Sequence, residues 1–265
     1  MSPKHNTTII IPHLGKSEES KYALKQCVDS LKMTCDLPVI LAANGGYAKG
    51  DINIKEQGQC KAVNEAVKQT NDSWLFVTND DMVYPPGWWE KLSNFVKYNP
   101  KIKCVSPNLC EPRPGAPPFK TYFCGGAGGD FNKEKFYAYA EFFQDFRLKE
   151  GFNLPFLITR ELWEKIEGYD ENYDPWGSNG DSDLQTKIYL AGEKTWRYYN
   201  VLIYHFSQTS GTFHPDQRKY WQENWDYFIK KWGFPRQGDD QKIWYSKELI
   251  DYEKLIYKPK WAKLK

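Results

Sequence analysis

The stretch SWLFVTNDDM, residues 73–82, is the most informative part of the chain for the fold, because an apolar run of strand length ends in three adjacent oxygen-bearing side chains. A short continuous apolar run is typical of a fully buried strand in a parallel sheet. Asn79, Asp80 and Asp81 follow the run, and ligands of open α/β sheets bind at the carboxyl ends of strands. Such oxygens suit a hard divalent cation, which commonly takes one or two carboxylates plus substrate phosphates. A polar turn that caps the next helix is the competing interpretation.

Strands and helices alternate before this stretch. Residues 7–11 and 38–43 are short apolar runs, whereas residues 17–33 and 59–69 have the apolar spacing of amphipathic helices, the first with Ser17 as a candidate N-cap. This alternation predicts an α/β fold with a mostly parallel central sheet and helices on both of its faces. The loops that follow the carboxyl ends of these strands are then the expected ligand site.

The pattern is less regular beyond residue 106. Residues 107–118 contain five prolines and the glycine-rich CGGAGGD follows at residues 124–130, so we expect a functional loop or a surface insertion there. We expect residues 215–265 to be mainly helical and rich in aromatic side chains. The other expected elements are a strand at 154–158, helices at 160–166 and 182–191, and strands at 195–199 and 201–204.

Composition excludes several classes of protein. The 36 Lys and Arg residues nearly balance the 34 Asp and Glu residues, which argues against a dedicated DNA-binding protein. The mean hydropathy of −0.73 and the lack of a long apolar run exclude a transmembrane helix. No apolar signal core is visible at the N-terminus, so we expect a cytoplasmic protein with reduced cysteines. The aromatic content of 17% excludes a disordered chain.

Two further polar features, one a cluster of residues and one a single histidine, could take part in catalysis or metal binding. WGSNGDSDL, residues 176–184, places Asp181 and Asp183 at the head of an expected helix. Carboxylates are stabilised there by about 0.3–1 kcal/mol, and one of them could equally serve as a general base. His205 ends an apolar run. A histidine at such a position is more often structural, unless it converges with Asp81 on a metal ion.

The order of these motifs resembles that of the family 2 glycosyltransferases, which are inverting enzymes of the GT-A fold. The likeness extends over roughly residues 7–233. The segments that carry it are IIIP (9–12), GQCKAVN (58–64), NDD with PGW (79–81 and 86–88), TREL and GYD (159–162 and 168–170), DSDL and AG (181–184 and 191–192), His205, and KWG (231–233).

The resemblance implies a role for each matching residue. Asp81 and His205 would hold Mn²⁺ or Mg²⁺, with Asn79 at the same site. Asp181 would be the general base that deprotonates the acceptor hydroxyl, with Asp183 as the competing carboxylate. The residues implied in nucleotide binding are Pro12, His13, Asn44, Lys61, Asn64, Asn79 and Asp80, and those implied in acceptor or sugar binding are Trp176, Asp183, Tyr84 and Trp88.

This sequence departs from the family pattern at two places. Ala43 and Asn44 stand where the family often has an acidic pair that meets the base, which leaves the identity of the nucleotide open. Gly180 stands where a glutamate usually precedes the catalytic aspartate, which leaves the choice between Asp181 and Asp183 open.

The resemblance also implies the domain organisation and the partners. A GT-A domain would cover residues 1–233, with a nucleotide-binding half at 1–106 and a sugar and acceptor half at 107–233. A helical, aromatic-rich extension would follow at 234–265. The partners would be a nucleoside-diphosphate sugar donor and a carbohydrate or glycoconjugate acceptor. We expect no nucleic acid, and at most peripheral membrane contact through the lysine-rich tail.

The aromatic side chains are unevenly distributed. Of the 11 Trp, 18 Tyr and 15 Phe, only Tyr22 and Tyr47 precede residue 74. The others gather where a sugar and an acceptor would bind, and rings offer apolar faces to sugar C–H groups. We therefore expect an aromatic-lined acceptor cleft. Two alternatives remain: a sugar nucleotidyltransferase, which would release pyrophosphate, and a non-catalytic protein that binds a nucleotide or sugar on the same fold.

Overall fold

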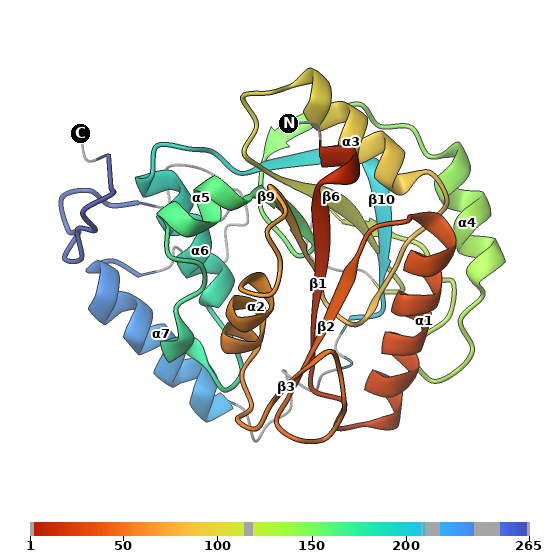
Figure 1. The fold of residues 1–265 in the computed structure, drawn as a ribbon, viewed down its shortest axis with the longest axis horizontal. Coiled ribbons are helices and arrows are strands. Elements are labelled where there is room, and N and C mark those ends of the chain that lie inside the picture. Colours follow the sequence, from red (N-terminus) through yellow and green to blue (C-terminus); the bar gives the residue numbers. More distant parts are fainter. Residues whose placement is uncertain (1–2, 114–118, 208, 210–217, 236–249, 264–265) are drawn as a thin grey trace.

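A central sheet organises the molecule, which we describe from a computed structural model over residues 3–113, 119–207, 209, 218–235 and 250–263 (Figure 1). Within these residues the sheet has ten strands, and its main order is β3-β2-β1-β4-β9-β6-β10-β5, with β7 beside β6 and β8 beside β10. The strands are β1 (Thr7–His13), β2 (Val39–Asn44), β3 (Ile52–Ile54), β4 (Trp74–Val77), β5 (Met82–Val83), β6 (Cys104–Glu111), β7 (Lys120–Thr121), β8 (Leu148–Glu150), β9 (Phe156–Thr159) and β10 (Trp196–His205).

Strand direction brings the important loops to one edge of the sheet. β3, β2, β1 and β4 are mutually parallel. β9 is antiparallel to both of its neighbours, β4 and β6, so β6 again runs in the direction of β4, and β10 is parallel to β6. The carboxyl ends of β1, β2, β4, β6 and β10 therefore lie along the same edge. The mostly parallel α/β fold predicted from the sequence is confirmed.

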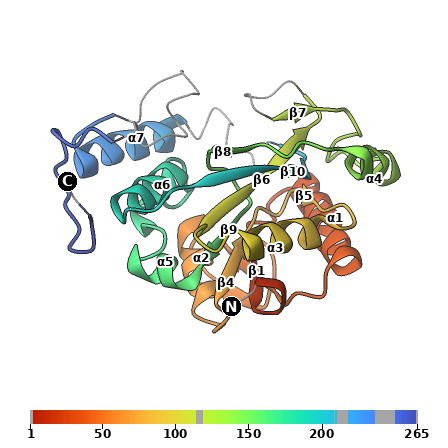
Figure 2. The ribbon, with the colours of Figure 1, turned by 90° about the horizontal axis from the view of Figure 1, so that it is seen from above.

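Helices cover both faces of this sheet. Figure 2 shows α2, α5, α6 and α7 on one side and α1, α3 and α4 on the other. The helices are α1 (Glu18–Thr34), α2 (Gln59–Val67), α3 (Trp88–Tyr98), α4 (Lys133–Phe142), α5 (Arg160–Lys165), α6 (Gly180–Leu190) and α7 (Arg218–Trp232), with 3₁₀ turns η1 (Pro3–His5) and η2 (Glu171–Tyr173). None of the helices in the described ranges is long and apolar enough to cross a membrane.

The alternation of side chains along β1 divides the core into two layers. Ile10 packs with α2, α5 and α6 in one cluster, whereas Ile9 and Ile11 pack with α1 and α3 in the other. All three isoleucines are fully buried. Successive side chains of a strand point to opposite faces, so an uninterrupted apolar run is what a strand covered on both faces requires. α1 begins as predicted, because the Ser17 side chain accepts a hydrogen bond from the Ser20 backbone N–H.

The expected loop from residue 107 is wrong for its first part, because β6 continues to Glu111 within the sheet. Pro107 is tolerated in this strand because it lies at an irregularity: Pro107 pairs with Tyr198, and the register with β10 then shifts before Leu202. Proline has no N–H for the ladder and is confined to edges and bulges. The two strands expected around residue 200 are accordingly one strand, β10. Residues 114–118 of the expected loop lie outside the described residues.

The C-terminal part is helical only in α7, as far as the chain is described. Residues 250–263 form turns and irregular segments without helix or strand, so the expected helix is wrong for them. They are held by backbone hydrogen bonds instead, from Ile256 N to Trp232 O and from Lys263 N to Leu190 O. Residues 215–217, 236–249 and 264–265 of the expected helical tail lie outside the described residues.

Candidate functional site

A buried polar network joins the ends of β1 and β2 to the loop after β4. His13 Nδ1 lies 2.5 Å from Asp80 Oδ2. The Asn44 amide donates to the His13 carbonyl at 3.1 Å and accepts from the Gly58 N–H at 3.0 Å. Burial raises the pKa of Asp80, against the effect of the His13 hydrogen bond. Three residues implied in nucleotide binding are thus brought together, on the edge where α/β folds bind ligands.

Asp81 and His205 also converge at this edge. The short strand β5 starts after Asp81 and pairs with the end of β10, with Met82 opposite His205. His205 Nε2 lies 3.4 Å from Asp81 Oδ2. Asp81 Oδ2 accepts a further hydrogen bond from Thr209 at 3.0 Å, whereas the buried Oδ1 has no hydrogen-bond partner among the described residues. A buried carboxylate oxygen without a partner is energetically unfavourable, which fits a ligand position.

Glu111, which the sequence did not suggest, contacts the other side of His205. Its Oε1 lies 2.8 Å from His205 Nδ1. Burial alone would lower the pKa of His205, but the charges and hydrogen bonds of Asp81 and Glu111 raise it to about 10. Burial would likewise raise the pKa of Asp81, but His205 and Thr209 hold it below its usual value.

These residues fit a divalent cation that is shared with a ligand. In the part of the chain that the structure describes, no group of three or more His, Cys, Asp or Glu side chains could hold a metal ion by itself. Asp81 and His205 supply one oxygen and one nitrogen position, and Mg²⁺ and similar ions commonly complete their coordination with substrate phosphates and water. Asn79, the third implied metal residue, is half-buried, and its backbone carbonyl accepts from Thr78 Oγ1 at 3.2 Å.

Asp181 lies in the first turn of α6 and is half-buried. Its Oδ1 accepts a hydrogen bond from the Tyr169 hydroxyl at 2.8 Å. Asn64 on α2 in turn holds the backbone of Tyr169, since it donates to the Tyr169 carbonyl at 2.9 Å and accepts from the Tyr169 N–H at 3.0 Å. Asn64, implied in nucleotide binding, therefore has both ends of its amide engaged with the polypeptide near Asp181.

Asp183 has a different environment from Asp181. Its side chain is fully buried, and its Oδ1 lies 2.7 Å from Lys231 Nζ and accepts from Trp232 Nε1 at 2.8 Å. Lys187 Nζ is 3.7 Å from the other oxygen. A carboxylate paired in this way anchors α7 to α6 and is out of reach of an acceptor sugar. We therefore remove Asp183 from the acceptor-binding residues and from the candidates for the base.

The loop that leads to Asp181 is attached to the start of α2. The Asp174 carboxylate accepts hydrogen bonds from the backbone N–H groups of Cys60 at 3.0 Å and Lys61 at 2.9 Å. Carboxylates are favourable at a helix N-terminus because the first N–H groups have no intrahelical partner. The Lys61 side chain, implied in nucleotide binding, pairs with Glu56 at 3.2 Å.

The expected aromatic contacts of the acceptor are only partly compatible with the structure. Tyr84 and Trp88 are 0% and 1% exposed and belong to the core, where their ring centroids lie 4.6 Å apart. A ring that is already covered cannot stack on a sugar, so we correct these two assignments to core residues. Trp176 is half-buried and its ring centroid lies 6.2 Å from that of Tyr220 on α7. Of the expected aromatic residues, Trp176 alone stays a candidate.

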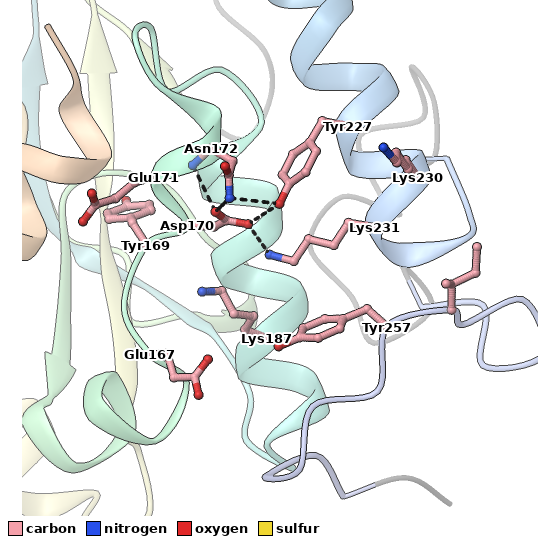
Figure 3. A pocket seen from close by; sticks show the side chains of 11 residues that line it. Glu167, Tyr169, Asp170, Glu171, Asn172, Lys187, Tyr227, Lys230, Lys231 and Tyr257 are labelled. Carbon is pink, nitrogen blue, oxygen red and sulfur yellow. Dashed lines mark hydrogen bonds and ion pairs between the residues drawn. The ribbon is translucent and has the colours of Figure 1, made fainter. Parts of the chain in front are cut away.

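A pocket of about 740 Å³ lies away from the Asp81 and His205 pair. One side of it is the segment that follows α5, and the other side is α7. Figure 3 shows Asp170 directed toward Tyr227 and Lys231 of α7, to which it is bound at 2.8 and 2.7 Å. Asp81, Asp181 and His205 are not among its lining residues. We place the candidate site at the strand edge because the chemically suitable groups are there.

Comparison with known proteins identifies a family for part of the chain. Residues 51–151 match the sequence model of the family described as "Glycosyl transferase family 2". The chain carries a family 2 glycosyltransferase region with the GT-A fold. The matched region includes Asn79, Asp80, Asp81 and Glu111. A comparison with curated protein sequences gives no match.

Solved glycosyltransferase structures share the fold. GalNAc-T7 with UDP, GalNAc and Mn²⁺ superposes with a TM-score of 0.58 at 13% identity, over 92% of this chain and 50% of that one. S. aureus TarS 1-349 superposes with a TM-score of 0.53 at 10% identity, over 77% of this chain and 61% of that one. The third structure is the mannosyltransferase PcManGT from Pyrobaculum calidifontis in complex with GDP-Man and Mn²⁺. It superposes with a TM-score of 0.51 at 15% identity, over 85% of this chain and 64% of that one. The chain thus spans from half to just under two thirds of their lengths, and these likenesses concern the fold alone.

Proposed function

We propose that this chain transfers a sugar from a nucleoside-diphosphate sugar to a hydroxyl of a carbohydrate or glycoconjugate acceptor, with inversion and with a divalent cation. The observation that supports this most is the pairing of Asp81 and His205 at the strand edge, with Asp81 Oδ1 buried and without a partner among the described residues. The resemblance of the motifs and the family match over residues 51–151 point the same way.

The donor side of the site consists of the network at the ends of β1, β2 and β4. Asp81 and His205 would hold Mn²⁺ or Mg²⁺, with Asn79 adjacent, and the ion would offset the negative charge that develops on the departing diphosphate. His13, Asn44 and Asp80 would form the wall of the nucleotide pocket together with Pro12, since their contacts hold the three strand ends together. This rigid, buried wall would orient the donor before reaction.

Asp181 is the proposed general base. Its carboxylate would take the proton from the acceptor hydroxyl while the hydroxyl oxygen bonds to the anomeric carbon and the bond to the donor phosphate breaks. The Tyr169 hydroxyl, 2.8 Å from Asp181 Oδ1, would hold the carboxylate in a fixed orientation. One carboxylate is sufficient for this proton transfer, and the Asp183 side chain is fully buried, with its Oδ1 bound to Lys231 and Trp232.

Substitution of Asp181 tests the proposal. Asp181→Asn should lower transfer roughly 10²–10⁴-fold, the usual contribution of general acid–base catalysis, while nucleotide binding measured by calorimetry stays unchanged. Asp226→Asn, at an exposed position on α7, is the matched control and should behave as wild type. Full activity of the Asp181→Asn variant would show that Asp181 is not the general base.

The reaction products distinguish the proposed reaction from its alternatives. A glycosyltransferase releases a nucleoside diphosphate, whereas a sugar nucleotidyltransferase releases pyrophosphate. A chain that binds a nucleotide-sugar but forms neither product would be a binding protein. Two substrate panels with Mn²⁺ therefore test the reaction type: UDP-, GDP- and dTDP-sugars, with water as the acceptor, are assayed for release of the nucleoside diphosphate. Nucleoside triphosphates with sugar 1-phosphates are assayed for release of pyrophosphate.

A further inference from the structure

We propose that Glu111 is the positioning residue of the metal site: it orients the His205 ring so that Nε2 is available to the divalent cation. This inference rests on the proposed function, because it assumes that a cation binds between His205 and Asp81. It adds a residue that lies outside the motifs on which the resemblance is based. Glu111 would act through His205 and would not itself touch the cation.

The strand pairing places Glu111 beside His205. β6 and β10 are parallel neighbours, and Cys110 is opposite Tyr204. Glu111 and His205 are the next residues of the two strands, and both come at the carboxyl end, where the candidate site lies. The pairing therefore sets the position of both side chains through the backbone.

The two ring nitrogens of His205 face two different carboxylates. Nδ1 lies 2.8 Å from Glu111 Oε1, and Nε2 lies 3.4 Å from Asp81 Oδ2. A neutral imidazole carries one N–H, so donation from Nδ1 to Glu111 leaves the lone pair on Nε2, which is the nitrogen on the Asp81 side. A histidine that binds a metal commonly donates its other N–H to a carboxylate, which also makes it a better ligand.

Among the residues that the structure describes, His205 is the one side chain within ion-pairing distance of the Glu111 carboxylate. Its side chain is only 11% exposed. Its backbone serves the sheet separately, since the carbonyl accepts from Tyr122 N at 3.0 Å. A buried carboxylate is unfavourable without a partner. The side chain is therefore explained by its contact with His205 and not by a wider ion-pair network.

The charges also fit a bound cation. Asp81 and Glu111 are two carboxylates on opposite sides of one imidazole. Once a divalent cation has displaced the proton from His205 Nε2, the two negative charges would match the charge of the cation. Replacement of Glu111 should therefore weaken the binding of the cation, although it removes none of the residues that bind the cation directly.

Two substitutions at Glu111 separate its charge from its hydrogen bond. Glu111→Gln keeps an oxygen that can accept from Nδ1–H but removes the charge, whereas Glu111→Ala removes both. The affinity for Mn²⁺ is measured by the electron paramagnetic resonance signal of the free ion, in the presence of whichever of UDP, GDP and dTDP stabilises the wild type most. We expect the dissociation constant to rise roughly 10–100-fold in Glu111→Ala and by a smaller factor in Glu111→Gln.

Controls separate a role in metal binding from a role in folding. Thermal unfolding in EDTA reports whether each variant is folded, and Glu111→Gln provides the test if Glu111→Ala does not fold. Glu150→Gln is the matched control, because Glu150 is a partly buried glutamate of β8 that pairs with Lys194. The Mn²⁺ affinity of this variant should equal that of wild type. A merely structural role would change unfolding but not the Mn²⁺ affinity of the folded variants.

The outcomes are distinguishable. If the wild type binds Mn²⁺ and both folded Glu111 variants bind it equally well, the positioning role is overturned and the proposed function stands. If the wild type itself shows no binding of Mn²⁺ with any of the three nucleotides, the metal-dependent function is overturned, and the role of Glu111 with it.

Discussion

The Tyr169 hydroxyl donates a hydrogen bond to Asp181 Oδ1 at 2.8 Å. Tyr169 is buried, and both its N–H and its carbonyl are bound by Asn64 of α2. The position of the proposed base is thus set by a helix that packs under the proposed nucleotide site. A change at the Tyr169 hydroxyl should therefore affect transfer more than donor binding.

Tyr169→Phe should lower the transfer rate about tenfold or more. A hydrogen bond to a charged group contributes about 1.5–3 kcal/mol, and about 1.4 kcal/mol of lost transition-state stabilisation corresponds to a factor of ten. Initial-rate kinetics at saturating donor measures the effect. Tyr227→Phe, which removes the hydroxyl bound to Asp170 at 2.8 Å, is the matched control. Equal rates in Tyr169→Phe and wild type would show that the hydroxyl does not orient Asp181.

Gly58→Ala should destabilise the junction between α2 and the loop that leads to Asp181. A Cβ at Gly58 would lie 2.4 Å from Asp174 Oδ2, the oxygen that accepts from Lys61 N. We expect a loss of about 1–3 kcal/mol, as for other overpacked sites, measured by urea unfolding. Gly128→Ala is the control, because nothing lies within 4 Å of its added Cβ. In an Asp174→Ala background, Gly58→Ala should lower the free energy of unfolding by a smaller amount. An equal loss in both backgrounds would mean that the added Cβ does not clash with Asp174.

Acid should weaken the attachment of α7 through Asp170. Burial would raise the pKa of Asp170, but the hydrogen bond and charge of Lys231 lower it to about 2. Because the folded-state pKa lies below the unfolded value of 3.8, this pair stabilises the fold above about pH 4 and loses its effect as the pH falls toward 2. The shift corresponds to about 2 kcal/mol.

Unfolding of Asp170→Asn by urea at several pH values measures this contribution. The variant should be less stable than wild type at pH 7, and the difference should shrink as the pH falls from 4 toward 2. Asp226→Asn, at an exposed position on the same helix as Lys231, should show no such dependence. A difference that stays constant down to pH 2 would mean that ionisation of Asp170 does not contribute.

Local patterns were sufficient to predict the fold. The uninterrupted apolar residues of β1 and β4 indicated strands covered on both faces, and Ser17 marked the start of α1. β6 was missed because Pro107 is unfavourable in a regular strand and is tolerated only through the bulge of the neighbouring strand. With β6 taken for a loop, Glu111 had no predicted position at the strand edge.

Parts of the candidate site depend on contacts between distant residues, which local patterns do not reveal. Asp181 and Asp183 are equivalent in sequence, and only the docking of Lys231 and Trp232 from α7 distinguishes them. Tyr84 and Trp88 follow the acidic motif, but they fill the core between the sheet and α3. An aromatic residue type is compatible with both a cleft and a core, so packing alone decided these assignments.

Binding of a nucleoside diphosphate at Asp81 is the central claim, and thermal unfolding with and without Mn²⁺ tests it most directly. UDP, GDP, dTDP and CDP are each added to wild type and to Asp81→Asn, since a ligand that binds only the folded state raises the unfolding temperature. We predict that at least one nucleotide raises the unfolding temperature of wild type, that Mn²⁺ is required, and that Asp81→Asn abolishes the rise. A rise of equal size in EDTA or in Asp81→Asn, or no rise with any nucleotide, would contradict the account.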